Sequence, residues 1–273
     1  MNTSKIITIA TMKGGTGKTT LVFNLACMLA SQYKVLAIDL DQQCNLSSNF
    51  GYDIFDESQP SVADMFEDLK TDPLDVVLLR PIEAIANLDL VPSTMYLQGT
   101  ELTLANAIAR ETIFLKYMEN HQDFFNHYDY IIFDTAPNFG ICTQNSLFAS
   151  DHILLVTDPD CNSARGADLF LYYWNKCRMY TDQPDKVSGL IINNVERTRI
   201  TAQTIEYITS HPVLSKLVMN TTIPHTTRFK ECGLQNLPIH MLETKTGQEE
   251  KSRQKAEKAM LELITELKER GVI

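Results

Sequence analysis

Short apolar runs alternate with longer segments of helical periodicity along this chain of 273 residues. The runs are continuously hydrophobic and rich in Val, Ile and Leu, without the alternation of a half-exposed strand. Continuous hydrophobicity indicates strands that are buried on both faces, and therefore a parallel sheet covered by helices on each side. The expected strands are residues 6–10, 35–39, 88–91, 130–134, 152–156 and 187–193, with a weaker candidate at 76–79.

This order of elements predicts an α/β fold with a doubly wound, mostly parallel twisted sheet and helices on both faces. We expect residues 1–273 to form a single domain, because no internal repeat or low-complexity linker interrupts the pattern. The acidic segment 53–73 is expected to be a helix flanked by loops. Residues 245–270 predict an amphipathic helix whose apolar side packs against the sheet.

The stretch between the first strand and the first helix carries the clearest chemical signal. Its sequence is Lys13-Gly-Gly-Thr-Gly-Lys-Thr-Thr20, and the apolar helical segment 21–30 follows. In a strand–turn–helix context, backbone N–H groups and the helix N-terminus together form an anion site. Lys18 can then reach the β- and γ-phosphates of a nucleotide, and the Thr19 hydroxyl can ligate Mg²⁺. The usual motif has glycine where this chain has Met12 and lacks the second lysine, Lys13.

Acidic residues stand at the ends of two other predicted strands. Asp39 and Asp41 occur in the sequence Asp-Leu-Asp-Gln-Gln-Cys-Asn, where two carboxylates at a strand end can lie near one phosphate site. Asp134 ends a hydrophobic strand, which is the setting of a Walker B carboxylate that holds Mg²⁺, usually through a water.

Taken together, these segments resemble the ParA/MinD family of ATPases with a deviant Walker A box. Residues 13–20 are similar to the family's phosphate loop, 39–45 to its switch I and 134–140 to its switch II. Residues 87–101 resemble a segment typical of ParA, and 157–166 resemble a loop at the family's dimer interface. The chain is thus identified as a ParA-type ATPase, in the small form without an N-terminal helix-turn-helix domain.

The resemblance implies roles for individual residues. Lys13 would reach across a dimer interface to the partner's nucleotide, and Asp41 would orient the attacking water, so Lys13, Lys18 and Asp41 form the expected catalytic set. Thr19, Asp39 and Asp134 would surround Mg²⁺. Asn193 would contact adenine or simply cap its strand, and Pro224 would border the base. The full expected ATP-binding set is Lys13, Gly14, Gly15, Thr16, Gly17, Lys18, Thr19, Thr20, Asn193 and Pro224.

Charge is spread unevenly along the chain, whose net charge is −10. Residues 1–164 hold 8 Lys and Arg against 21 Asp and Glu, whereas residues 165–273 hold 16 against 13. An acidic protein can still bind nucleic acid through a local basic face, although a solvated mixed-charge surface explains the same composition. Arg228 matches a family position linked to DNA contact. Its basic neighbours Lys230, Lys251, Arg253 and Lys255 are further candidates.

The family resemblance implies slow ATP hydrolysis that a ParB-like centromere-binding partner accelerates. A homodimer formed on ATP binding would bind DNA nonspecifically and drive the segregation of plasmid or chromosomal DNA. The main alternative is a MinD-like membrane-associated positioning ATPase, for which Val272 and Ile273 make a poor anchor. A non-hydrolysing scaffold is a weaker alternative, because Lys18, Thr19, Asp41 and Asp134 occur together.

Cysteine spacing and hydropathy argue against several other classes of protein. An iron–sulfur reductase would need two ligand cysteines, and the six scattered cysteines give no convincing pair, so we expect no Fe–S cluster. No apolar run approaches the ~18–20 residues needed to span a bilayer, and the chain begins without a recognisable signal peptide. We therefore expect a cytoplasmic, nucleoid-associated protein that does not bind membranes and whose thiols are reduced.

Overall fold

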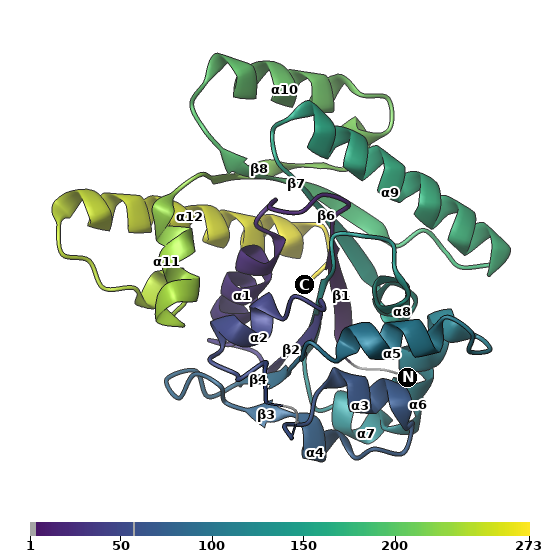
Figure 1. The fold of residues 1–273 in the computed structure, drawn as a ribbon. Coiled ribbons are helices and arrows are strands. Elements are labelled where there is room, and N and C mark those ends of the chain that lie inside the picture. Colours follow the sequence, from purple (N-terminus) through teal and green to yellow (C-terminus); the bar gives the residue numbers. More distant parts are fainter. Residues whose placement is uncertain (1–3, 57) are drawn as a thin grey trace.

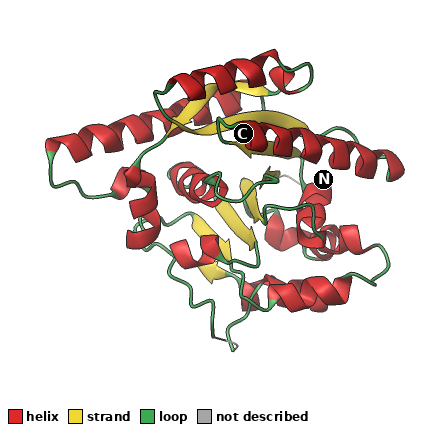
Figure 2. Ribbon diagram, turned by 45° about the horizontal axis from the view of Figure 1, so that its top comes forward, coloured by secondary structure: helices red, strands yellow, loops and turns green. Residues whose placement is uncertain are grey.

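The computed structural model describes residues 4–56 and 58–273, which form a central sheet between two layers of helices (Figures 1 and 2). The eight strands run in the order β3-β4-β2-β5-β1-β6-β7-β8. β3 is antiparallel to β4, and the other neighbouring strands pair in parallel, which confirms the predicted fold class. The strands are Lys5–Ala10 (β1), Val35–Leu40 (β2), Leu78–Leu79 (β3), Leu88–Val91 (β4), Tyr130–Thr135 (β5), His152–Thr157 (β6), Val187–Val195 (β7) and Val218–Pro224 (β8).

Helices cover both faces of the sheet. α1, α2, α11 and α12 pack on one face, and the helices from α3 to α10 lie on the other (Figure 1). No helix in the described part of the chain is long and apolar enough to cross a membrane. The α-helices are Lys18–Leu29 (α1), Asn45–Asn49 (α2), Val62–Glu67 (α3), Pro73–Val76 (α4), Leu97–Leu104 (α5), Ile113–Asn120 (α6), Gln122–Phe125 (α7), Ile141–Ala149 (α8), Cys161–Tyr180 (α9), Arg199–Ser210 (α10), Thr227–Gln235 (α11) and Gly247–Glu269 (α12).

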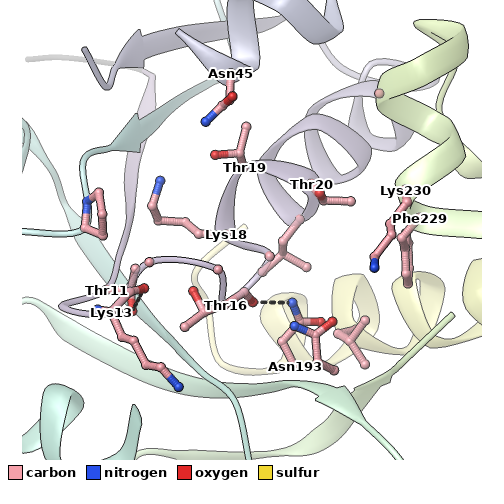
Figure 3. Close-up of a pocket in the computed structure, with 18 of the residues that line it drawn as sticks. Thr11, Lys13, Thr16, Lys18, Thr19, Thr20, Asn45, Asn193, Phe229 and Lys230 are labelled. Carbon is pink, nitrogen blue, oxygen red and sulfur yellow. Dashed lines mark hydrogen bonds between the residues drawn. The ribbon is translucent and has the colours of Figure 1, made fainter. Parts of the chain in front are cut away.

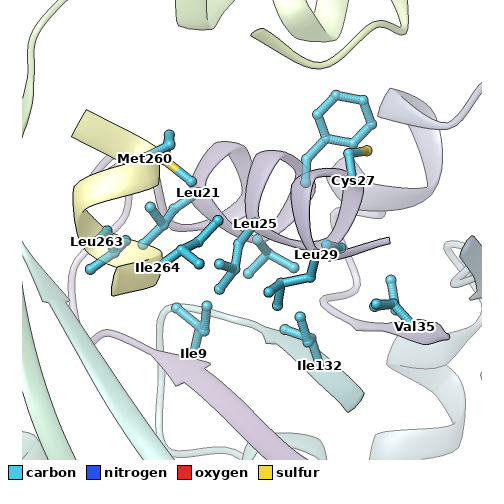
Figure 4. Close-up of a cluster of buried hydrophobic side chains, with 14 of the residues drawn as sticks. Ile9, Leu21, Leu25, Cys27, Leu29, Val35, Ile132, Met260, Leu263 and Ile264 are labelled. Carbon is cyan, nitrogen blue, oxygen red and sulfur yellow. The ribbon is translucent and has the colours of Figure 1, made fainter. Parts of the chain in front are cut away.

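The core around α1 explains why the phosphate-loop helix is held so firmly. Leu21, Leu25 and Leu29 of α1 are buried against the sheet, where Ile9 lies below them (Figure 4). α12 supplies Met260 and neighbouring apolar residues to the same cluster, as the amphipathic pattern of this segment predicted. Full burial of one such side chain contributes about 1.5–3 kcal/mol, so the cluster fixes α1 relative to the strands.

One weaker expectation was only partly right, because a short-range signal interrupts the pattern. The predicted strand 76–79 is reduced to β3, since Asp72 caps and Pro73 opens the short helix α4. The acidic segment 53–73 contains the expected helix, α3, whose start is fixed by a capping box at Ser61 and Asp64.

One strand, β8, was not expected from the hydrophobic pattern. It is an edge strand with polar residues in its middle, so its sequence lacks a continuous apolar run. Its amides at Asn220 and Thr221 donate hydrogen bonds of 2.8 Å each to the Glu266 carboxylate of α12. A side chain that is remote in sequence therefore satisfies backbone amides of this edge strand. The hydrophobic pattern near residue 220 could not predict this contact.

Strand register brings the predicted acidic residues to one end of the sheet. Asp39 of β2 lies opposite Asp134 of β5, and Asp134 in turn lies opposite Ile9 of β1. The phosphate loop begins directly after β1. Three segments that are far apart in sequence therefore meet beyond the carboxyl ends of adjacent parallel strands, where ligands bind in folds of this class.

Candidate active site

A cavity of about 660 Å³ opens at this end of the sheet, between the phosphate loop and α11 (Figure 3). The whole 13–20 loop lines it, together with Asp41 from the β2 end. Pro137 lines the wall after β5, whereas Asn193 and Phe229 stand on the far side. The segments that we predicted separately as parts of a nucleotide site therefore line one cavity.

The glycines of the loop are required by its shape. Gly15 and Gly17 have φ values of +83° and +73°, a left-handed conformation that side chains disfavour. A Cβ on Gly17 would also lie 2.5 Å from the Asn193 side-chain nitrogen. α1 begins immediately afterwards at Lys18, so its N-terminus points its unpaired amides and positive dipole end towards the cavity.

Lys18 lines the cavity and forms a buried ion pair with Asp134, which lies beneath the cavity wall. The Lys18 ammonium contacts Asp134 Oδ1, and the two side chains are 5% and 0% exposed. Within the described residues, Asp134 Oδ2 and the hydroxyl of Thr16 are buried polar atoms with no hydrogen-bond partner. Since buried oxygens are nearly always satisfied, these atoms fit a site built for a cation and a phosphate. Thr19 follows Lys18 at the start of α1 and also lines the cavity (Figure 3).

The two acidic residues at the carboxyl end of β2, Asp39 in the strand and Asp41 after it, have different environments. Asp41 lines the cavity, and burial raises the pKa of its carboxyl group. Asp39 is fully buried and accepts hydrogen bonds from the Asp41 amide at 3.1 Å and from the Ser47 amide and hydroxyl at 2.9 and 2.8 Å. The Asp39 oxygens therefore hold the loop that carries Asp41 and the start of α2 in place. Asp39 thus supports the predicted Mg²⁺ site through these segments.

The buried Asp39 predicts a dependence of stability on pH. Burial, then the nearby Asp134 charge, raise the pKa of Asp39 from 3.8 to about 7. Between these two values the unfolded chain releases a proton that the folded protein keeps, so the free energy of unfolding should fall as pH rises from 4 towards 7. Urea unfolding of nucleotide-free protein across this range measures the slope. Asp39→Asn should flatten it, and an unchanged slope in that variant would contradict the assignment.

Lys13 points away from the cavity floor and is paired within its own chain. Its ammonium lies 2.6 Å from Asp160 Oδ2, and both side chains are about two-fifths exposed. Asp160 also caps α9 through the amides of Asn162 and Ser163. Partial burial opposes the effect, but hydrogen bonds from Lys13 and Ser163 lower the pKa of Asp160 to about 2. The lysine expected to reach a partner is therefore held by the loop after β6.

Asn193 contacts the phosphate loop itself. Its side-chain amide donates a hydrogen bond of 2.6 Å to the Thr16 carbonyl, drawn as the dashed line in Figure 3. The same side chain lines the cavity, so a contact with adenine stays a prediction. Pro224 is buried at the end of β8, and its neighbours Ile223 and His225 line the cavity.

Removal of the Asn193 amide should loosen the loop and weaken nucleotide binding. A single hydrogen bond of this kind is worth about 1 kcal/mol, so Asn193→Ala should raise the dissociation constant for ATP about fivefold. Asn193→Asp should be worse, because it places a carboxylate oxygen against the Thr16 carbonyl. Titration with a fluorescent ATP analogue tests the order. Equal affinities for the three proteins would show that the contact has no role in binding.

The predicted DNA-contact residues divide into two groups. Arg228 is buried and pairs with Glu231 at 2.6 Å and with Glu249 at 3.3 Å, and Arg253 pairs with Glu250 and Glu257. These ion pairs neutralise both guanidinium groups, so neither arginine is presented as a free cation. Lys230 is exposed but lines the cavity, whereas Lys251 and Lys255 are exposed on α12.

Several cavity residues were missed from the sequence. Asn45 lies within the 39–45 segment, so its motif already carried a signal that it belongs to the site. Phe229 and Met260 come from α11 and α12, about 200 residues after the phosphate loop in the sequence, and only chain folding places them there. Asp160 was likewise passed over, although it lies in the segment compared with the family's interface loop.

The glycine loop, its buried lysine and the strand-end aspartates define a P-loop nucleotide-binding protein. A family model described as an AAA domain matches residues 4–185. The sporulation initiation inhibitor protein Soj of Bacillus subtilis is 30% identical over 237 residues, which cover 86% of this chain and 90% of Soj. The chain therefore belongs to the ParA/Soj family of ATPases.

Other similarities agree with this placement. The chromosome partitioning protein ParA of Myxococcus xanthus is 29% identical over 244 residues, covering 89% of this chain and 83% of that protein. An ATP complex of McdA from Cyanothece superposes with a TM-score of 0.82 over 98% of this chain and 97% of McdA, at 21% identity. At 21% sequence identity, this structural similarity supports the assignment of the fold and nothing further.

Proposed function

We propose that this protein hydrolyses Mg-ATP and uses the cycle of ATP binding and hydrolysis to move or segregate DNA. The observation that carries the proposal is the cavity floor formed by the phosphate loop and Lys18. The Lys18 ammonium contacts the buried Asp134, whose second carboxylate oxygen has no hydrogen-bond partner among the described residues. Soj and ParA, which resemble this chain along most of its length, are named for sporulation control and chromosome partitioning.

In this proposal each residue of the floor has a separate task. The loop amides and Lys18 bind the β- and γ-phosphates, and Lys18 leaves Asp134 when it does so. Thr19 and Asp134 hold Mg²⁺, which when bound neutralises phosphate charge. Asp41 orients the attacking water at the cavity wall. Because phosphoryl transfer depends mainly on positioning and electrostatics, small movements of the Asp41 loop control the rate.

A homodimer forms when ATP is bound, because the γ-phosphate of one subunit attracts Lys13 of the other. This step requires Lys13 to leave Asp160, which holds it at 2.6 Å. The dimer joins two C-terminal halves and their basic side chains. Lys251 and Lys255, one helical turn apart on α12 and exposed, are the residues we propose for nonspecific contact with DNA phosphates.

The partner and the location follow from the same proposal. A ParB-like centromere-binding protein accelerates hydrolysis and so releases the dimer from DNA, which places the protein on the nucleoid in the cytoplasm. The MinD-like alternative would use apolar C-terminal residues to reach a bilayer. In this chain Val272 and Ile273 are buried in the core cluster around α1 and α12, which favours the DNA-bound function.

The decisive experiment is co-sedimentation with nonspecific duplex DNA in the presence of ATP, ADP or no nucleotide. The proposal expects binding with ATP alone. Lys251→Glu/Lys255→Glu should lose DNA binding while ATP binding is kept. Lys70→Glu/Lys116→Glu is the matched control, because it makes the same change in charge at exposed lysines on the other side of the sheet from α12. Absence of DNA binding in every nucleotide state would overturn the proposal. Liposome sedimentation in parallel then tests the membrane alternative.

A further inference from the structure

Glu101 of α5 lies beside the beginning of α8, a helix that has no side-chain cap of its own. The N-cap residue of α8 is Gly140, which offers no side-chain acceptor. Glu101 Oε1 instead accepts a hydrogen bond of 3.4 Å from the Cys142 amide in the first turn. A carboxylate at this position satisfies a free amide and complements the positive end of the helix dipole.

Gly140 fits closely around this carboxylate. Its φ of −70° and ψ of 178° suit any residue, so its backbone conformation does not require glycine. A Cβ at this position would, however, overlap Glu101 Oε1 and lie 2.8 Å from Asn138 Oδ1, so an added methyl group would have to displace these side-chain ends. Asn138 in turn accepts a hydrogen bond of 2.7 Å from the Gly140 amide. Glu101 therefore packs directly on the turn before α8.

That turn forms part of the nucleotide cavity. It follows Asp134 in the chain, and its Pro137 lines the cavity wall. Pro137 also faces the phosphate loop, since a Cβ on Gly14 would lie 4.0 Å from the proline ring. On the other side, the negative charge of Glu101 is near enough to Asp41 to act on its carboxyl group electrostatically. Glu101 thus contacts the turn that follows Asp134 and acts electrostatically on Asp41.

The helix that carries Glu101 is anchored independently of α8. Leu97 and Leu104 of α5 are buried in the core cluster between the sheet and the helix layer that includes α8. The Thr100 hydroxyl donates a hydrogen bond of 2.8 Å to Glu67, at the end of α3. A side chain on such a fixed helix can hold a neighbouring turn in one position.

We propose that Glu101 is a positioning residue of the ATPase site, which fixes the start of α8 and thereby sets the 136–140 turn against the phosphate loop. The inference rests on the proposed ATPase function. Most of the affinity for ATP comes from the loop and the base side of the cavity, which Glu101 does not contact. Loss of Glu101 should therefore reduce the rate of hydrolysis and leave ATP affinity nearly unchanged.

The test measures ATP affinity and single-turnover hydrolysis in Mg²⁺ buffer for the full chain and five variants. Glu101→Ala should hydrolyse ATP about tenfold more slowly, since small misplacements of catalytic segments carry penalties of this order or larger. Glu101→Gln keeps an oxygen acceptor for the Cys142 amide and should recover most of the rate. Gly140→Ala should displace Glu101 and reproduce the defect. Glu119→Ala is the control, because it removes an exposed carboxylate of α6 that pairs with Lys116 and does not support α5.

The outcomes separate the inference from the proposed function. Wild-type protein that fails to bind or hydrolyse ATP overturns the proposed function itself. With an active wild type, an unchanged rate in Glu101→Ala overturns the inference. So does a loss of ATP affinity parallel to the loss of rate, or a glutamine variant no better than alanine. The double variant Glu101→Ala/Gly140→Ala should be no slower than either single variant, because both changes remove the same contact.

Discussion

Replacement of Lys18 by alanine is expected to abolish ATP binding and to destabilise the nucleotide-free protein at the same time. The first effect follows from the loss of the cation that faces the phosphates in the loop. The second follows from Asp134, which is fully buried and would be left without its partner. Breaking a buried ion pair from one side costs about 3–5 kcal/mol, a large part of the stability of a typical domain.

A double variant distinguishes these two effects. Lys18→Ala/Asp134→Asn removes both charges, so it should recover much of the lost stability while ATP binding remains absent. Urea unfolding and nucleotide titration of the wild type, both single variants and the double variant complete the cycle. If Lys18→Ala unfolds at the wild-type urea concentration, the buried pair does not stabilise the nucleotide-free state as we infer.

Lys13→Ala and Asp160→Asn should shift ATP-dependent dimerisation in opposite directions. Without Lys13 the proposed contact with the partner's γ-phosphate is lost, so the dimer should not form although each subunit still binds ATP. Asn is as good a helix N-cap as Asp, so Asp160→Asn should keep α9 intact while it releases Lys13. A partly exposed ion pair is worth up to about 1 kcal/mol, so the ATP concentration for half-maximal dimerisation should fall up to fivefold.

Analytical ultracentrifugation over a series of ATP concentrations measures both shifts. Ser163→Ala is a useful control, because it removes one hydrogen bond to Asp160 and leaves the contact between Lys13 and Asp160 in place. An Asp160→Asn protein that needs more ATP than the wild type would show that Asp160 supports the dimer. A Lys13→Ala protein that still dimerises with ATP would remove Lys13 from the proposed interface.

The hydrophobic pattern was sufficient for the central strands because their environment is uniform along their length. β2 and β5 are buried throughout, so their sequences are continuously apolar until they end near Asp39 and Asp134. The parallel arrangement then follows, and with it the meeting of both aspartates with the phosphate loop. The hydrophobic pattern did not predict the edge strand β8, because burial changes from residue to residue along this strand. Two of its amides are also satisfied by Glu266 of α12, which is remote in sequence.

The sequence by itself determined the family and the central strands of the sheet and predicted the phosphate-binding loop, since these depend on short contiguous segments whose residue types have a local physical reason. The tertiary structure alone decided which partners those residues have. It paired Lys13 with Asp160, enclosed Arg228 between Glu231 and Glu249, and brought Glu101 to the start of α8. Such contacts depend on the packing of elements far apart in the chain, and no periodicity or motif records which side chains will meet.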